Sequence, residues 1–208
     1  MIKAVIVQAR MTSTRLPGKV MLPLGDRTVL GEVLFRCSQI PGIDLVCCAI
    51  PEGPEHNQLF IEAEKYKAKI FRGSELDVLD RYYQAALKFG ITTVMRITSD
   101  CPLLDPVLCG VILEEHLNNS EIYTCNNYPP SWPHGLDCEV FSFKDLETAN
   151  LKAKQPEERE HVTPWIRKNL PIRNISNPKG NEYHVRITLD TQEDYINIKK
   201  ALQSNEYI

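Results

Sequence analysis

The chain has 208 residues, of which 43% are hydrophobic and 25% are charged, and this composition predicts one soluble globular domain over residues 1–208. The formal net charge of −3 argues against nucleic acid as the main partner, because proteins that bind the phosphate backbone usually carry a basic excess. No apolar stretch has the length needed to span a bilayer, so we expect no membrane association.

Short apolar runs and segments with helical spacing alternate over the first two-thirds of the chain. Strands are predicted over residues 2–7, 45–50, 69–71 and 93–97. Helices are predicted over residues 29–40, 56–66, 76–89 and 106–117. This alternation predicts an α/β fold with a mostly parallel sheet and helices on both of its faces.

The second half of the chain is less regular. We expect strands over residues 122–125 and 136–143, and two late strands over 173–176 and 184–187 that could pair with each other. Helices are expected over residues 143–152, 162–170 and 191–203, the last with Thr191 as a candidate N-cap. Residues 128–133 are predicted to be a loop, and the polar segment 155–159 is assigned to no element.

The cysteines indicate a reducing compartment. There are seven, an odd number without a C-x-x-C pair, which is typical of small buried side chains and argues against a zinc site. The first apolar run is too short for a secretory signal peptide. We therefore expect a cytoplasmic protein.

The loop after the first strand carries the most informative chemistry in the chain. It places cations and hydroxyl groups around a Pro-Gly turn, among them Arg10, Ser13, Arg15 and Lys19. Guanidinium, ammonium and backbone N–H groups at the carboxyl end of a buried strand suit a polyanion, of which a nucleoside triphosphate is the most plausible. The loop matches neither G-x-x-x-x-G-K-[ST] nor G-x-G-x-x-G, and the alternative is an ordinary basic surface loop.

Two aspartates also follow buried strands. Asp100 comes after the strand over 93–97, and Asp190 comes after the late run Val185–Leu189. Beside a triphosphate such carboxylates would repel the ligand unless a divalent cation lay between them, so they predict an Mg²⁺ site. The alternative role is capping of a turn or helix, which suits Asp105 before Pro106 well and Asp100 less well.

Three motifs extend this interpretation by resemblance. The segments Q-A-R-M-T-S-T-R-L-P-G-K, R-I-T-S-D-C-P-L-L-D-P and L-D-T-Q-E-D-Y resemble the cytidylyltransferases that activate acidic sugars, which include the CMP-KDO and CMP-sialate synthetases. The segments R-G-S-E-L-D-V-L-D-R-Y-Y, P-H-G-L-D-C-E-V-F and R-E-H-V-T-P-W are similar to the branch of spore-coat polysaccharide biosynthesis protein F-like proteins. The matches follow one another over nearly the whole chain.

The resemblance implies a nucleotide-diphospho-sugar transferase fold, which is a Rossmann-like three-layer α/β/α sandwich. It also implies an enzyme that transfers CMP from CTP to a sugar, with an acidic 2-keto sugar as the expected acceptor, and releases pyrophosphate in cell-surface or spore-coat polysaccharide synthesis. Mg²⁺ is the implied cofactor. Relatives are often dimers, so a homodimer is an open expectation.

The resemblance also assigns roles to individual residues. The implied nucleotide-binding residues are Arg10, Ser13, Arg15, Lys19, Arg72 and Gly73. Metal binding falls to Asp100 and Asp190, and catalysis to Lys19, Asp100 and Arg10. Glu139 and His161 match segments that face the sugar or the dimer partner. His134 stands where the branch often has an acid, which leaves the identity of the acceptor sugar open.

Three other functions remain compatible with the sequence. One is an enzyme of the same fold that uses a different nucleotide or a sugar phosphate. Another is a glycosyltransferase that binds a sugar nucleotide with the same basic loop and aspartate. The third is an inactive nucleotide-binding subunit of a polysaccharide pathway, which the joint presence of Lys19, Asp100 and Asp190 disfavours.

Overall fold

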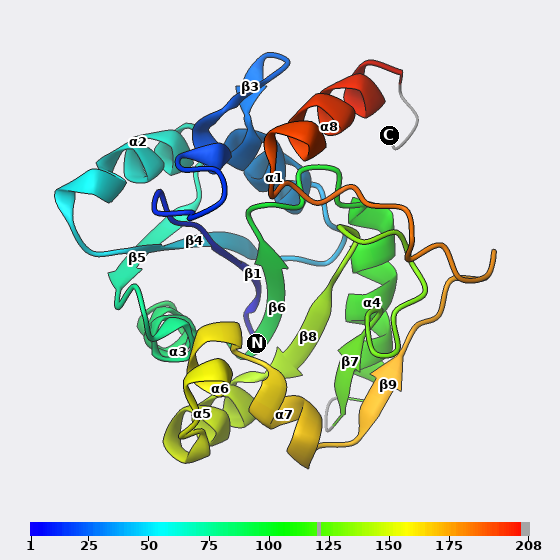
Figure 1. The fold of residues 1–208 in the computed structure, drawn as a ribbon. Coiled ribbons are helices and arrows are strands. Elements are labelled where there is room, and N and C mark those ends of the chain that lie inside the picture. The colour runs from blue at the N-terminus through cyan, green and yellow to red at the C-terminus, as the bar shows by residue number, and fades with distance from the viewer. Residues whose placement is uncertain (120–121, 205–208) are drawn as a thin grey trace.

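The computed structural model describes residues 1–119 and 122–204, and its centre is a seven-stranded sheet of order β5-β4-β1-β6-β8-β7-β9 (Figure 1). The strands are β1 (Lys3–Gln8), β4 (Leu45–Pro51), β5 (Lys69–Gly73), β6 (Thr93–Thr98), β7 (Tyr123–Cys125), β8 (Glu139–Ser142) and β9 (Ile172–Asn174). Neighbouring strands run parallel except that β8 is antiparallel to both β6 and β7. The prediction of a mostly parallel sheet is confirmed.

Helices cover both faces of the sheet (Figure 1). They are α1 (Val29–Ser38), α2 (Asn57–Lys65), α3 (Val78–Lys88), α4 (Pro106–Asn118), α5 (Phe143–Lys152), α6 (Pro156–His161), α7 (Pro164–Asn169) and α8 (Gln192–Ser204). Alternate side chains of β1 enter different cores, since Val5 and Val7 pack with α1, α2 and α4, while Ala4 and Ile6 pack with α3, α5 and α7. This arrangement is the expected three-layer α/β/α sandwich.

A third apolar cluster closes the carboxyl edge of the parallel strands. It contains Leu24, Val29, Leu103, Ile187, Leu189 and Ile198. It packs α8 against the short strand β2 (Pro23–Leu24), which pairs antiparallel with β3 (Arg27–Thr28). In Figure 1 α8 and β3 lie together above the tips of β1 and β6. The cluster thereby brings the end of the chain back to the edge where the first loop begins.

One prediction for the second half is wrong, and one segment without an assignment forms a helix. Residues 184–187 form no strand and do not pair with 173–176, because β9 joins the sheet beside β7 and Arg186 makes only an isolated bridge to His134. The polar segment 155–159 lies in α6 for most of its length, which has Pro156 in its first turn and a Glu158 carboxylate that accepts from the Gln155 N–H at 3.1 Å.

The remaining elements lie close to their predicted ranges, and all seven cysteines are buried with free thiols. None of the helices in the described ranges combines the length and the apolar character that a membrane crossing requires.

Candidate active site

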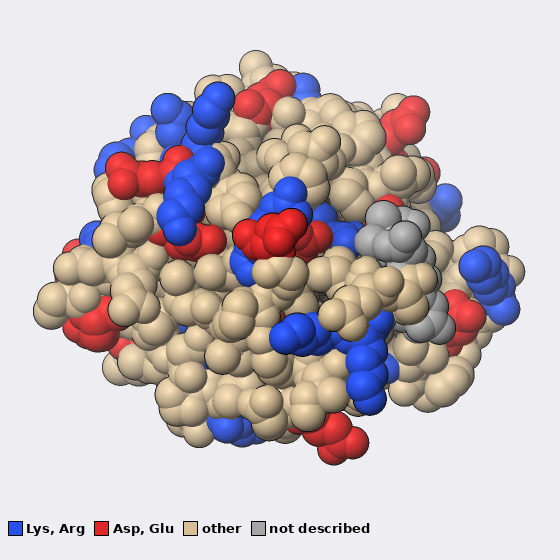
Figure 2. Space-filling view, turned by 90° about the horizontal axis from the view of Figure 1, so that it is seen from above, with Lys and Arg blue, Asp and Glu red and all other residues tan. Residues whose placement is uncertain are grey.

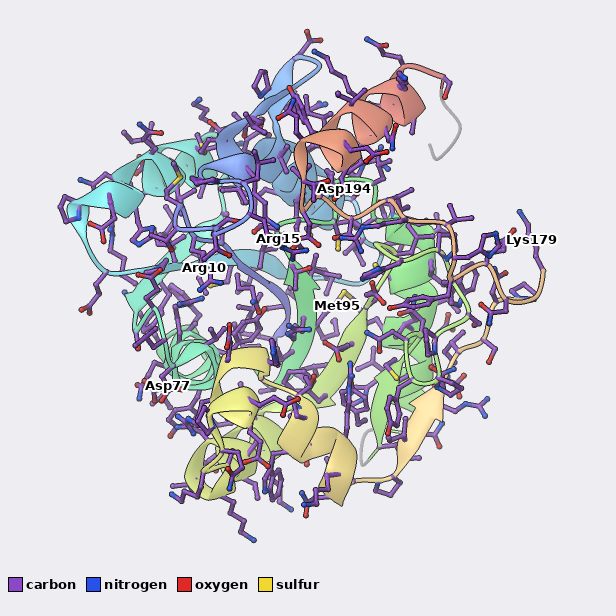
Figure 3. All side chains as sticks on the ribbon, viewed as in Figure 1. Arg10, Arg15, Asp77, Met95, Lys179 and Asp194 are labelled. Carbon is purple, nitrogen blue, oxygen red and sulfur yellow. The ribbon has the colours of Figure 1, made fainter. Side chains whose placement is uncertain are left out.

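A cavity of about 540 Å³ opens at the carboxyl edge of the parallel strands. This volume is within the usual range for a small-molecule site. Basic and acidic side chains meet near the centre of this face (Figure 2), and Arg10 and Arg15 lie at the end of β1 and β6 in Figure 3. The charged residues that line the cavity are Arg10, Arg15, Lys19, Arg81, Arg96, Asp100, Asp137, Glu160, Arg167 and Asp190. Cations outnumber acids, so the lining favours an anionic ligand.

Lys19 joins the two predicted metal aspartates. Its Nζ lies 3.1 Å from Asp100 Oδ2 and 3.0 Å from Asp190 Oδ1, and it donates to the Leu189 carbonyl oxygen at 2.6 Å. The side chain of Lys19 is 11% exposed, so these contacts lie mostly out of water. Asp100 and Asp190, which lie 81 and 171 positions after Lys19 in the sequence, therefore converge on its ammonium group.

Local backbone chemistry sets this convergence. Gly18 adopts a left-handed conformation (φ 69°), and its N–H donates to the Met11 carbonyl oxygen at 2.9 Å, which closes the first loop and begins the short helix at Lys19. The Leu189 N–H donates to the Asp100 carbonyl oxygen at 2.7 Å. That bond holds the segment before Asp190 directly against the end of β6.

Asp190 is ionised by its surroundings. Partial burial alone would raise the pKa of its carboxyl, but the hydrogen bond and charge of Lys19 together with the charge of Arg15 lower the pKa below its usual value. Arg15 lies 2.7 Å from Asp190, and Arg186 pairs with the other carboxylate oxygen. Asp190 therefore stays negative over the whole physiological pH range.

Carboxylate and carbonyl oxygens around Lys19 form a donor set that suits a hard divalent cation. The Lys19 ammonium marks the point where Asp100, Asp190 and the Leu189 carbonyl converge. Mg²⁺ prefers such oxygen ligands and takes the rest of its shell from phosphate and water. Asp100 keeps 29% of its side chain exposed, which leaves carboxylate surface available to the cavity.

The structure brings most of the predicted site residues together. Those that line the cavity are Arg10, Ser13, Arg15, Lys19, Asp100, His161 and Asp190. Of the described residues predicted for the site, Arg72, Gly73 and Glu139 do not line it. The Arg72 guanidinium instead donates to the Gly53 carbonyl oxygen at 3.2 Å and to Asn57 Oδ1 at 2.8 Å, and so ties β5 to the start of α2.

Glu139 lies beneath the cavity in a polar network. Its carboxylate is 1% exposed and pairs with Arg96 and Arg167, and it also accepts from Tyr123 and from the Thr163 hydroxyl at 2.9 Å. Burial would raise the pKa of Glu139, yet the two guanidinium charges lower it to about 2. One carboxylate thus serves two cavity-lining arginines, so these three side chains together carry a net positive charge.

A segment next to these arginines positions His134. Its N–H donates to the Val185 carbonyl oxygen at 2.8 Å, and its own carbonyl oxygen accepts from the Ile187 N–H at 2.8 Å. The centre of its ring lies 5.1 Å from that of the Tyr183 ring. Gly135 (φ 123°) has to be glycine, because a Cβ there would lie 2.8 Å from the Ile187 carbonyl carbon. His134 and Tyr183 both line the cavity.

Sequence reasoning missed several lining residues, among them Arg81, Arg96, Asp137 and Arg167. Arg96 carried a usable signal, because a cation inside an apolar strand needs a buried partner. The others sit in polar or amphipathic segments where nothing distinguishes them. Burial raises the pKa of the Asp137 carboxyl, which is typical of functional sites.

Comparisons with known proteins identify the family and the fold of the chain. The family model described as cytidylyltransferase matches residues 4–205. The spore coat polysaccharide biosynthesis protein SpsF of Bacillus subtilis is 32% identical over 207 residues, which cover 95% of this chain and 85% of that protein. A solved cytidylyltransferase from Leptospira borgpetersenii superposes with a TM-score of 0.93 at 32% identity, over 98% of this chain and 88% of that one.

A more distant structure shares the fold. It is a CMP:2-keto-3-deoxy-manno-octonic acid synthetase complexed with CTP, with a TM-score of 0.73 at 16% identity, over 98% of this chain and 99% of that one. The expected nucleotidyltransferase fold is therefore confirmed. From the family match over nearly its whole length and the relatives at 32% identity, this chain belongs to the cytidylyltransferase family and is a nucleotidyltransferase.

Proposed function

We propose that this single domain is a cytoplasmic enzyme that transfers CMP from CTP to a hydroxyl of an acidic 2-keto sugar and releases pyrophosphate, for cell-surface or spore-coat polysaccharide synthesis. The observation that carries the proposal is the convergence of Lys19, Asp100 and Asp190 inside a basic cavity. The spore-coat protein at 32% identity supports the pathway, and the fold shared with a CTP-bound synthetase supports the nucleotide.

The nucleotide end of the cavity is the edge next to the first loop. Arg10 and Arg15 hold the β- and γ-phosphates there. Lys19, whose three N–H donors bond Asp100, Asp190 and Leu189, adds its charge to stabilise the leaving pyrophosphate. Ser13 adds a hydroxyl donor. Buried polar atoms of other lining residues, Gln8 Oε1, Arg81 Nε and Arg96 Nε, have no hydrogen-bond partner among the described residues, and a bound ligand would satisfy such groups.

Asp100 and Asp190 would hold Mg²⁺ between the protein and the triphosphate. The ion supplies electrophilic polarisation of the α-phosphate when it is bound. The ionised state of Asp190 and the exposed carboxylate surface of Asp100 support this assignment. Lys19 keeps the two carboxylates at one point and limits their mutual repulsion.

The acceptor end is the part of the cavity lined by residues of α6 and α7. The excess positive charge of Arg96 and Arg167 over the single Glu139 carboxylate supports an acidic sugar. His134 and His161 line the same cavity and supply hydrogen-bonding groups for sugar hydroxyls. Glu139 acts from below by fixing the two arginines.

The reaction needs little covalent chemistry from the protein. The sugar hydroxyl oxygen forms a bond to the α-phosphorus, the bond from that phosphorus to the bridging oxygen breaks, and pyrophosphate leaves while the hydroxyl proton passes to water. Catalysis therefore depends on positioning and on cations aimed at the charge that develops on the phosphates.

Pyrophosphate release with CTP, Mg²⁺ and a panel of 2-keto sugar acids tests the proposal. We expect release with one acceptor and a loss of about 10²-fold or more in Asp100→Ala. Release of a nucleoside diphosphate from a sugar nucleotide would identify a glycosyltransferase instead. Thermal shifts with the four nucleoside triphosphates test the base, because a ligand that binds only the native state raises the melting temperature.

A further inference from the structure

Three side chains outside the cavity lie directly behind the first loop. Glu55 and His56 belong to the short helix before α2, and Glu75 lies between β5 and α3. His56 is fully buried, whereas Glu55 and Glu75 keep 52% and 32% of their side chains exposed. None of the three lines the cavity as the structure describes it, and none has a role in the chemistry proposed above.

This group holds the loop at two consecutive residues. The Met11 N–H donates to His56 Nδ1 at 3.3 Å, and the Thr12 hydroxyl donates to a Glu75 carboxylate oxygen. His56 Nε2 lies 3.6 Å from Glu55 Oε1 and 3.7 Å from Glu75 Oε2. The imidazole is therefore placed between a loop N–H on one side and two carboxylates on the other.

The bond from Met11 fixes the tautomer of His56. A backbone N–H can only donate, so Nδ1 carries no proton and the neutral ring carries its proton on Nε2. That proton faces the two carboxylates, which favour it electrostatically. Neither carboxylate comes within hydrogen-bond distance of Nε2, so Glu55 and Glu75 favour this tautomer through their charge alone and thereby keep Nδ1 available as an acceptor.

The same three residues offer a nitrogen and two carboxylates at metal-ligand spacing. A metal on Nε2 would require that nitrogen to be unprotonated, and a metal-bound histidine normally donates through its other nitrogen. Here the other nitrogen already accepts a hydrogen bond from Met11. The tautomer therefore favours a structural support for the loop over a second metal site.

We propose that Glu55, His56 and Glu75 form a brace that holds Met11 and Thr12 and thereby positions the nucleotide loop before CTP binds. Met11 and Thr12 lie between Arg10 and Ser13, which both line the cavity. A loop that is already ordered loses less conformational entropy on binding, so the brace raises nucleotide affinity without touching the ligand. The three are positioning residues, and this inference rests on the proposed function.

Four variants test the brace. His56→Leu keeps the bulk but removes the acceptor, while His56→Asn offers its Oδ1 in place of Nδ1. Thr12→Val removes the exposed hydroxyl, and Thr12→Ser keeps it. We expect His56→Leu and Thr12→Val to raise the calorimetric Kd and the KM for CTP about fivefold to tenfold, the equivalent of one hydrogen bond, with kcat changed less than threefold. His56→Asn and Thr12→Ser should keep most of the affinity for CTP.

His116 provides the matched control. It is also a buried histidine, its Nδ1 lies 2.9 Å from the Ile122 carbonyl oxygen, and it does not line the cavity described above. His116→Leu should lower the melting temperature and leave the affinity for CTP unchanged. An equal loss of affinity in this control would mean that the His56 effect is general destabilisation, and would overturn the brace.

Amide hydrogen exchange at Met11 and Thr12 in the nucleotide-free protein separates the two proposals. Faster exchange in His56→Leu than in His56→Asn supports the brace even if CTP proves not to be the ligand, in which case the proposed function fails alone. Unchanged exchange together with unchanged affinity overturns the brace. A bound Mn²⁺ equivalent, seen by EPR in the parent protein and lost in His56→Leu, would also overturn it in favour of a metal site.

Discussion

Lys19 connects three parts of the chain through one ammonium group. Its contacts with Asp100, Asp190 and the Leu189 carbonyl oxygen are charge-assisted and mostly buried, so each is stronger than a surface ion pair. Two carboxylates that face each other without this cation would repel, and at least one would take up a proton more readily. Lys19 therefore controls the charge state of the pair as well as its geometry.

The first prediction concerns Lys19→Met, which keeps the length of the side chain and removes its charge. The pKa of Asp190 should rise, because the hydrogen bond and charge of Lys19 lower it in the parent protein, and pyrophosphate release should fall about 10²- to 10³-fold. Carboxyl NMR titration and initial rates measure the two effects. Lys3→Met is the control, since Lys3 pairs with Asp44 at the opposite edge of the sheet, and neither quantity should change there.

Glu139 contributes to stability in a way that depends on pH. Its pKa is about 2 in the folded protein and near 4.5 when unfolded, so the folded state binds its proton less readily. The contribution is complete above about pH 4.5 and disappears as pH falls toward 2. Acid should therefore weaken the network that holds Arg96 and Arg167 before it affects neutral parts of the core.

The second prediction follows for Glu139→Gln. Urea unfolding at pH 7 should give a loss of about 3 kcal/mol, because two partly buried guanidinium groups lose their counter-charge. The difference from the parent protein should shrink as the pH is lowered from 5 toward 2, since the parent carboxyl becomes protonated over that range. A difference that stays constant with pH would show that the lost packing, and not the charge, accounts for the effect.

Individual residues differ in how far the sequence could predict them. Arg10, Lys19 and Asp100 were predicted from polar groups that follow the carboxyl ends of strands, and all three line one cavity. Asp190 lines it as well, although the strand predicted before it does not form. Arg167 could not be found in this way, because its role depends on a buried Glu139 carboxylate that only the folded sheet places beneath it. An ion pair between residues of different elements, such as Arg167 and Glu139, cannot be predicted from the spacing of residues within one segment.

At the scale of elements, the junction of α6 and α7 is strained. Val162 has φ 68° and ψ −54°, and the Thr163 N–H donates to the His161 carbonyl oxygen at 2.8 Å, which together define a γ-turn of the rare positive-φ kind. A β-branched residue is unfavourable there, and Val162 is nevertheless fully buried. The turn connects a cavity-lining histidine to a threonine that bonds Glu139.

The third prediction compares two small substitutions at this turn. Glycine tolerates positive φ and alanine does not, so Val162→Gly should be more stable than Val162→Ala by about 1 kcal/mol in urea unfolding. The same pair at Val33, a fully buried residue inside α1, should show the opposite order, because glycine is about 1 kcal/mol worse than alanine in a helix. If the alanine variant were more stable than the glycine variant at both Val162 and Val33, the backbone at Val162 would not be strained.

Element prediction failed where tertiary context decides. The run 184–187 alternates like a strand, but its Val185 C=O and Ile187 N–H bond to His134 and its Val185 N–H bonds to Glu182, so it does not join the sheet. The helix α6 was missed because its sequence is polar all round, and α6 has none of its residues buried. Long helices such as α1 and α3 were predicted correctly, because their apolar residues recur at helical spacing and those same residues are the buried ones.

At the scale of the whole molecule, the candidate site depends on the third apolar cluster. The two large clusters pack the faces of the sheet, whereas Ile187 and Leu189 on one side and Ile198 of α8 on the other form a separate small core at the carboxyl edge. Small peripheral clusters open at lower free energy than the main core. The position of Asp190 therefore has less support than that of Asp100, which directly follows a central strand.

The fourth prediction separates local from global stability with two isoleucine-to-alanine substitutions. Ile198 is 1% exposed in the third cluster, and Ile91 is 2% exposed at the amino end of β6, on the edge opposite the cavity. Each change should cost about 2–4 kcal/mol of local packing. Ile198→Ala should lower kcat/KM about tenfold or more at 25 °C, because a shift of Asp190 by about 1 Å disturbs the geometry on which catalysis depends.

Ile91→Ala should keep nearly parental kcat/KM at that temperature although its melting temperature falls more, since its loss is spread over the cooperative core. Amide exchange in α8 should accelerate only in Ile198→Ala. Equal losses of activity in the two variants would mean that the edge cluster unfolds together with the main core. In that case α8 would stabilise the whole fold and not specifically the aspartate that it follows.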